Sequence, residues 1–284
     1  MKFTKMQGIG NDYIYVDCTG TDLPDPAALA RRLSDRHFGI GGDGLVLILP
    51  GEHADFRMRM FNSDGSEAEM CGNASRCVGK YVYDRGLTDR ETLTLETGAG
   101  IKTLRLHPEH GIVKSVTVDM GVPRLRPEEI PVLPEKAGWP AGEDRIQERP
   151  MQVGGRSFSV TCVNMGNPHC IIFQDSVEDW PIEQWGPLFE NAEIFPRRIN
   201  TEFAQVLDRN RIRMRVWERG SGETMACGTG ACATLVAAAL TGRTERKAAL
   251  LLNGGSLEIE WEEKSGRVLM TGPAEFVFDG EIEI

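Results

Sequence analysis

The sequence predicts an α/β (α+β) protein of two pseudo-symmetric halves, each a curved, mostly antiparallel sheet wrapped around a central helix. Three observations support this: an internal repeat, a Cys-Gly helix start in each copy, and many short strand patterns around one helix per half. We expect an N-terminal half at 1–120, completed by a last strand at 273–284, and a C-terminal half at 121–272. A two-fold arrangement would bring the two cysteine-bearing helices face to face across a cleft that holds the active site.

The internal repeat has one ungapped offset. Cys71-Gly72 returns as Cys227-Gly228, and subtracting 71 from 227 gives 156. The same offset places Gly10-Asn11 on Gly166-Asn167. A period this long excludes a solenoid and indicates duplication of a whole unit. Further matches at the same offset are 57–62 with 213–218, Glu67 with Glu223 and Gly86 with Gly242.

The elements of the first half follow from apolar periodicity and turn residues. Asp25 is the expected N-cap of a helix that begins at Pro26 and runs to Arg36. A second helix follows Cys71-Gly72 and ends near Gly86. Alternating or continuous apolar residues predict strands at 3–6, 13–16, 45–49, 57–61, 92–96, 101–106 and 113–120.

The second half repeats this plan after a connecting segment. Residues 123–155 are rich in proline and charge, so we expect a solvated link with a surface insertion at 134–150. Helices are predicted at 179–190 and, rich in alanine, at 231–240. The predicted strands are 158–163, 170–173, 211–217, 248–252, 256–261, 267–271 and 275–278.

Composition limits the classes of partner. A length of 284 residues suits two domains, and a net charge of −10 argues against nucleic acid or an acidic membrane as a general partner. No signal peptide is visible, and no apolar stretch reaches the roughly 18 residues of a membrane span. The seven scattered cysteines indicate reduced thiols rather than a disulfide framework. We therefore expect a cytoplasmic protein.

The two Cys-Gly pairs suggest a reaction. A helix start can hold an anion with its unpaired N–H groups, and it favours loss of a thiol proton. If a substrate Cα–H lay between two such thiols, one could remove the proton and the other deliver one to the opposite face, which inverts the configuration. The helix N–H groups could hold the substrate carboxylate as charge develops. Nothing in the sequence indicates a pyridoxal lysine or a metal cluster, so no cofactor and no metal are expected.

Other polar residues precede the second thiol. His169 and Glu218 could set thiol protonation or hold a substrate amine, although each alone is more often structural. Asn62 takes the place of Glu218 in the first copy, which breaks the symmetry. Arg219 matches Ser63 and has no basic counterpart, so it could bind a second, distal carboxylate.

Several motifs resemble, in order and spacing, those of the diaminopimelate epimerase family. The resemblance covers nearly the whole chain. It implies cofactor-independent epimerisation of LL-diaminopimelate to meso-diaminopimelate, in lysine and peptidoglycan precursor biosynthesis, by a homodimer. The motifs are 6–12, 61–67, 70–73, 165–169, 218–220 and 226–230.

The resemblance also implies which residues form the site. The catalytic pair falls on Cys71 and Cys227, and the supporting polar pair on His169 and Glu218. Some family members carry glutamine where this chain has Gly44, so no side-chain contact is expected there. The implied substrate-binding residues are Asn11, Asn62, Gly72, Asn73, Asn167, Asn200, Glu218, Arg219, Gly228 and Thr229.

Three alternatives belong to other classes or branches. Proline and hydroxyproline racemases share the fold but resemble a Met-Cys-Gly-His signature, against which Asn73 argues. A thiol redox or metal-binding protein would favour a Cys-x-x-Cys pair, which the sequence lacks; Cys77 and Cys232 are expected to be small apolar core residues. A non-catalytic amino-acid-binding protein would bind ligand without exchange of the Cα proton.

Overall fold

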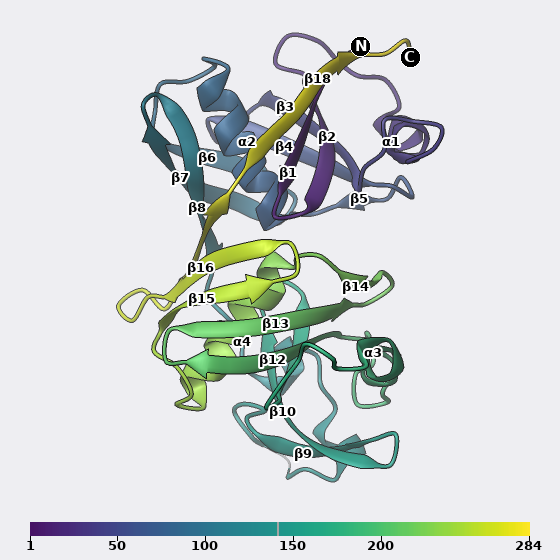
Figure 1. The fold of residues 1–284 in the computed structure, drawn as a ribbon, viewed down its shortest axis with the longest axis vertical. Coiled ribbons are helices and arrows are strands. Elements are labelled where there is room, and N and C mark those ends of the chain that lie inside the picture. The colour runs from purple at the N-terminus through teal and green to yellow at the C-terminus, as the bar shows by residue number, and fades with distance from the viewer. Residues whose placement is uncertain (141) are drawn as a thin grey trace. The chain divides into compact units, whose positions relative to one another are not determined.

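The computed structural model describes residues 1–140 and 142–284. They form two compact units, one of Met1–Asp119 with Thr271–Ile284 and one of Met120–Met270. Each unit is a sheet packed on one helix of 13 residues (Figure 1). In the first unit this helix is buried along nearly its whole length.

The first unit contains two helices and most of the early strands. Asp25 caps the first helix, because its side chain accepts a hydrogen bond of 3.1 Å from the Ala28 N–H. This confirms the predicted helix start. The helices are α1 (Pro26–Ser34) and α2 (Gly72–Asp84), and the strands are β1 (Lys2–Gly8), β2 (Asn11–Asp17), β3 (Gly44–Pro50), β4 (Phe56–Asn62), β5 (Glu67–Ala68), β6 (Thr92–Thr97), β7 (Gly100–Glu109), β8 (Ile112–Gly121) and β18 (Glu275–Glu281).

The second unit adds two short 3₁₀ helices before its sheet. These are η1 (Pro127–Glu129) and η2 (Pro134–Ala137). The α-helices are α3 (Ile182–Glu190) and α4 (Gly228–Leu240). The strands are β9 (Arg149–Val153), β10 (Arg156–Asn164), β11 (Pro168–Phe173), β12 (Asn200–Asp208), β13 (Arg211–Glu218), β14 (Gly222–Thr224), β15 (Lys247–Leu252), β16 (Gly255–Trp261) and β17 (Val268–Pro273).

The duplication is confirmed in three dimensions. Helices α3 and α4 begin and end 156 residues after α1 and α2. Strands β1 to β7 pair in the same order and direction as β10 to β16, with a parallel pair at β2–β3 and at β11–β12. Even the register is kept, since Tyr13 lies opposite Gly44 and His169 lies opposite Asn200. The predicted α/β class of two related halves is therefore correct.

The two copies differ in the strand that pairs with the outer edge of their first strand, β1 in the first unit and β10 in the second. In the first unit, β18 pairs antiparallel with β1, so the two ends of the chain lie side by side (Figure 1, yellow and purple). In the second unit, β9 takes the equivalent position beside β10. The C-terminal strand therefore supplies to the first unit what a local hairpin supplies to the second.

The predicted solvated link at 123–155 is wrong. Ile130, Val132, Trp139 and Ile146 are buried and pack in the core of the second unit with residues such as Phe158. The Trp139 indole N–H donates to the Pro150 carbonyl at 2.7 Å. Averaged composition hid these apolar residues because they stand singly between prolines and charges. Residue 141, inside the predicted insertion, lies outside the described residues.

The burial of one cysteine in each long helix agrees with the prediction from the sequence. Cys77 in α2 and Cys232 in α4 are fully buried, as predicted for small apolar residues. All seven cysteines lie in the described part of the chain and are thiols. No helix among the described residues combines the length and the apolar character needed to cross a membrane.

Candidate functional site

Cys71 stands at the start of α2. It is the N-cap residue, with an extended backbone at φ −136°, and its carbonyl accepts the first helical hydrogen bond, 2.9 Å from the Ser75 N–H. The first turn of a helix leaves N–H groups without acceptors inside the helix. The half-buried thiol of Cys71 therefore lies next to a set of donors suited to a carboxylate.

Asn11 connects this thiol to a carboxylate. The Asn11 Oδ1 lies 3.4 Å from the Cys71 Sγ and accepts at 3.4 Å from the Asn73 side-chain amide. The other end of the Asn11 amide donates at 2.7 Å to the Asp43 Oδ2, which also accepts from the Asp12 N–H at 3.1 Å. Asp43 thus fixes which end of the Asn11 amide faces the thiol.

Charged side chains, some of them buried, hold this arrangement in place. The fully buried Arg76 donates to the Asn73 Oδ1 at 2.9 Å and to the Pro273 carbonyl at 3.0 Å. Arg36 bridges Asp12 and Asp43 at 2.7 and 3.0 Å. Although burial alone would raise the pKa of Asp12, hydrogen bonds from Arg36 and from a buried lysine hold that pKa below its usual value.

Two positions beside this cluster admit only glycine. Gly10 has φ +86° and its repeat partner Gly166 has φ +104°, so both turns that lead to an asparagine use the left-handed region. At Gly44, a Cβ would overlap the Phe61 carbonyl oxygen and come within 2.8 Å of the Tyr13 ring. A glutamine at this position therefore does not fit this backbone.

Asn62 lies at the end of β4, in register with Gly44 on the neighbouring strand. It is half-buried, and its side-chain amide donates to the Ser66 hydroxyl at 3.0 Å. The structure thus brings Asn11, Gly72 and Asn73 around the first thiol and leaves Asn62 in a loop contact of its own.

Cys227 occupies the equivalent place on α4. It is the N-cap residue at φ −122°, and its carbonyl accepts from the Ala231 N–H at 2.9 Å. Its side chain is 5% exposed, and its Sγ lies 3.4 Å from the Thr229 hydroxyl. The prediction that a helix begins at each Cys-Gly pair is therefore confirmed.

The sheet under α4 carries three ionisable side chains on one face. His169 on β11 lies opposite Asn200 on β12, and Glu202 on β12 lies opposite Val216 on β13. Because side chains two residues apart share a face, Glu202 lies with Asn200 and Glu218 lies with Val216. Helix α4 packs on these strands. His169, Glu202 and Glu218 therefore gather beneath its N-terminal end.

His169 is fully buried between two polar partners. Its Nδ1 lies 2.7 Å from the Glu202 Oε1, and its Nε2 lies 2.9 Å from the Asn167 Oδ1. Asn200 lies beside it and donates to the Pro168 carbonyl at 3.1 Å. His169 is thus part of β11 and is fixed at both ring nitrogens, whereas the predicted strand begins only at residue 170.

Arg219 is tied to the same strand by its backbone. The Arg219 N–H donates to the Asn200 Oδ1 at 3.0 Å, and its guanidinium donates to the Arg197 carbonyl at 3.0 Å. Asn200 therefore links the β11–β12 pair to the loop that carries Arg219. This link fixes where the arginine leaves β13.

Glu218 reaches the second thiol. Burial raises the pKa of the Glu218 carboxyl above its usual value, while hydrogen bonds with Thr224 and Cys227 and the charge of His169 act against that rise. The Thr224 hydroxyl donates to the Glu218 Oε1 at 2.5 Å. The carboxylate is therefore held within reach of the Cys227 thiol.

The expectation that the helix start lowers the pKa of Cys227 is wrong for this structure. Burial raises the pKa of the Cys227 thiol well above its ordinary value, and the charges of Glu218 and Glu202 raise it further. The Thr229 hydroxyl and the Gly230 N–H act in the opposite direction but do not outweigh these causes. Cys227 is therefore a protonated thiol at neutral pH.

Sequence reasoning missed Glu202, Asp43 and Thr224. Glu202 stands two residues after Asn200, so the two side chains share a face once this segment is a strand, but no strand is predicted here from the sequence. Asp43 lies in a glycine-rich loop, and its contact with Asn11 joins residues 32 positions apart, which no local pattern indicates. Neither residue has an equivalent in the other copy, so the repeat could not reveal them.

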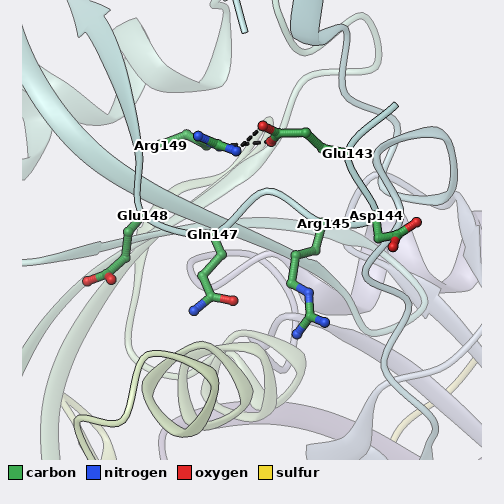
Figure 2. Close-up of a pocket in the computed structure, with 6 residues that line it drawn as sticks. All are labelled: Glu143, Asp144, Arg145, Gln147, Glu148 and Arg149. Atoms are coloured by element: carbon green, nitrogen blue, oxygen red, sulfur yellow. Dashed lines mark hydrogen bonds and ion pairs between the residues drawn. The ribbon is translucent and has the colours of Figure 1, made fainter. Parts of the chain in front are cut away.

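A surface pocket lies elsewhere in the second unit. It has a volume of about 430 Å³ and is lined by polar side chains of the single segment 143–149 (Figure 2). Within it, Arg149 and Glu143 point toward one another as an ion pair, and Gln147 donates to the Leu240 carbonyl at 3.0 Å. None of the predicted site residues lines this pocket. Among residues 1–140 and 142–284, no cluster of His, Cys, Asp or Glu side chains could hold a metal ion.

Comparison with known proteins identifies the family. The model of the family described as diaminopimelate epimerase matches residues 3–126 and 161–277. A diaminopimelate epimerase of Acetivibrio thermocellus is 56% identical over 284 residues, covering 100% of this chain and 99% of the relative. One of Methanococcus maripaludis is 57% identical, covering 100% of both chains.

Solved structures with little sequence identity show the fold alone. A probable proline racemase from Agrobacterium radiobacter matches with a TM-score of 0.71 at 14% identity, covering 100% of this chain and 93% of the other. A phenazine biosynthesis protein of the PhzF family from Bacillus anthracis matches with a TM-score of 0.70 at 16% identity, covering 100% and 99%. With the family model and full-length relatives above half identity, this chain belongs to the diaminopimelate epimerase family.

Proposed function

We propose that this protein interconverts LL- and meso-diaminopimelate without a cofactor, with Cys71 and Cys227 as the two acid–base groups. The observation that carries the proposal is the duplication of a cysteine N-cap, one in each unit, in a member of this family. The relatives that are 56% and 57% identical over the whole chain bear the name of this activity.

The proposed reaction moves one proton in and one proton out. The thiolate of one cysteine takes the proton from the substrate Cα, and the electron pair of the broken C–H bond passes into the α-carboxylate. The thiol of the other cysteine then gives its proton to the opposite face of the same carbon. The configuration inverts, and the two cysteines exchange protonation states. The mechanism requires both sulfur atoms to reach one substrate carbon.

Backbone amides supply the charge stabilisation in this scheme. The first turns of α2 and α4 offer the N–H groups of Gly72, Asn73, Gly228 and Thr229 to the α-carboxylate. The hydrogen bonds from these N–H groups become stronger as negative charge develops on the carboxylate. Because they are stronger in the transition state than with bound substrate, they lower the activation free energy. Preorganised donors of this kind contribute about 10²–10³-fold each.

The α-ammonium group has its partners near Cys227. Glu218 is held beside the thiol and carries the charge that a cation needs. Asn167 in the second unit, and Asn11 and Asn62 in the first unit, are the further polar residues that we expect the substrate to contact. When the ammonium group binds, it offsets the carboxylate charges that raise the pKa of Cys227. Substrate binding would thus lower the pKa of the Cys227 thiol and favour its thiolate form.

The second carboxylate distinguishes diaminopimelate from smaller amino acids. Arg219 is half-buried and is positioned by Asn200, and a guanidinium pairs with a carboxylate through two parallel hydrogen bonds. Proline has no such group. This residue therefore favours diaminopimelate over proline as the substrate.

The test is exchange of the α-proton with solvent. The purified, reduced protein is incubated with LL-diaminopimelate in D₂O and followed by NMR, beside the variants Cys71→Ala and Cys227→Ala. We expect deuterium at Cα together with the meso isomer, both lost in each variant. Exchange with proline but not with diaminopimelate would move the protein to the racemase branch. Binding without any exchange would leave a non-catalytic amino-acid-binding protein.

We also propose that the protein acts as a homodimer in the cytoplasm. The notion rests on the family resemblance and on the seven thiols of the chain. Light scattering after gel filtration should give twice the chain mass of 31.4 kDa. A mass equal to one chain at micromolar concentration would exclude the dimer.

A further inference from the structure

Glu202 is a buried carboxylate with an unusual balance of partners. Its side chain is 0% exposed, and its Oε1 pairs with the His169 Nδ1 at 2.7 Å. Its Oε2 has no hydrogen-bond partner among the described residues. An ionised carboxylate in such a place is costly unless a cation faces it. Stability of the strand therefore does not explain why a glutamate stands here.

The first copy of the repeat shows what the fold uses when no glutamate is present. At the offset of 156, Glu202 matches Val46 and His169 matches Tyr13. Val46 is fully buried in the same register of the sheet. The charged pair is therefore an addition to the second unit and not a requirement of the duplicated fold.

Helix α4 has a glycine at the position that faces this carboxylate. Gly230 matches Ala74 of the first copy. A Cβ on Gly230 would come within 2.6 Å of the Glu202 Oε1 and 3.3 Å of the Cys227 Sγ. The carboxylate of Glu202 thus lies directly under the first turn of α4, close to the second thiol. Gly230 therefore leaves space for the Glu202 carboxylate in the same turn of α4 that places the Cys227 thiol.

We infer that Glu202 is a positioning residue that holds His169 as an imidazolium cation next to the two carboxylates that act on Cys227. The ring has an acceptor at each nitrogen, the Glu202 Oε1 at 2.7 Å and the Asn167 Oδ1 at 2.9 Å. Two acceptors need two N–H donors, and an imidazole that donates from both nitrogens is positively charged. The protonation of His169 is argued from these contacts alone, whereas its effect on the substrate rests on the proposed function.

The consequence concerns the charge that the substrate meets. Glu218 from β13 and Glu202 from β12 act on the Cys227 thiol at the start of α4, and the Cys170 thiol also lies near Glu202. His169 from β11 contacts Glu202 directly and acts on Glu218 through its charge. A cationic His169 cancels one of the two carboxylates. The remaining negative charge suits one α-ammonium group. Glu202 therefore acts through His169 and does not itself contact the substrate.

The direct test is the state of the His169 ring in the unmodified protein. Histidine labelled with ¹⁵N gives separate signals for protonated and unprotonated ring nitrogens, and the variant His169→Gln assigns the signal among the five histidines. At pH 8 we expect both His169 nitrogens to carry protons, and one of them to lose its proton in Glu202→Gln. A neutral ring in the unmodified protein would overturn the inference, as would a ring unchanged in Glu202→Gln.

Kinetics separate positioning from folding. Glu202→Gln keeps the shape and one acceptor, so its melting temperature should stay close to that of the parent while kcat falls about 10- to 100-fold and KM changes little. Thr201→Val on the same strand is the matched control, with kcat unchanged, because it removes a buried hydroxyl that has no hydrogen-bond partner in the described part of the chain. A Glu202→Gln enzyme with parental kcat would refute the positioning role. If the parent protein fails to exchange the diaminopimelate proton, the proposed function fails, and the ring spectrum still decides the inference.

Discussion

Gly230 provides a quantitative test of the space beneath α4. In the variant Gly230→Ala, the new Cβ lies 2.6 Å from the Glu202 Oε1, closer than such contacts allow. Alanine gains up to about 1 kcal/mol over glycine in a helix, but overpacking a filled interior costs about 1–3 kcal/mol. We expect the free energy of unfolding to fall by about 1–2 kcal/mol, which corresponds to roughly 2–8 °C in melting temperature.

The repeat supplies the compensating variant. The first copy combines Ala74 with Val46, so Gly230→Ala with Glu202→Val recreates in the second unit a pair that the fold already accommodates. Glu202→Val alone leaves the His169 Nδ1 without its acceptor, at a cost of about 1–3 kcal/mol. In the double variant the clash is absent, so we expect it to be more stable than the sum of the single effects by about 1 kcal/mol or more.

Urea unfolding followed by tryptophan fluorescence measures these energies in the relevant unit. All five tryptophans of the chain stand between residues 139 and 261, within the second unit. The signal therefore reports this unit alone. If Gly230→Ala is as stable as the parent, or if the two substitutions add without coupling, the carboxylate of Glu202 does not occupy the space under the helix.

Three further predictions concern the two thiols and the substrate. Because burial and nearby carboxylates raise the pKa of Cys227, iodoacetamide should alkylate this thiol at pH 7 more slowly in the folded protein than in the urea-unfolded chain, and the rate should rise with pH. Peptide mass spectrometry measures the alkylation rate, and faster alkylation in the folded protein would contradict the prediction. Asp43→Ala should lower kcat/KM about 10- to 100-fold because it frees the Asn11 amide, whereas Asp43→Asn should lose less; equal losses would refute the orienting role. Arg219→Met should raise the KM for diaminopimelate about 10- to 100-fold with a smaller change in kcat, and an unchanged KM would exclude contact with the distal carboxylate.

The sequence alone determined the plan of the fold. A single offset of 156 residues linked the two copies, and the structure repeats it in both pairs of helices and in the strand register. Local signals also sufficed for the caps, since Asp25, Cys71 and Cys227 stand where a helix begins. Such features are readable because they depend on residues close together in the chain.

The tertiary structure decided the chemistry around the thiols. Nothing local joins Glu202 to His169 or Asp43 to Asn11, because these pairs meet only where a parallel strand pair forms. Composition misjudged 123–155 because burial depends on single residues such as Ile130 and not on an average. A helix start lowers the pKa of a thiol by its dipole, but burial and two carboxylates from other strands reverse that direction at Cys227. The sequence could name the thiol, while only the folded chain could set its charge.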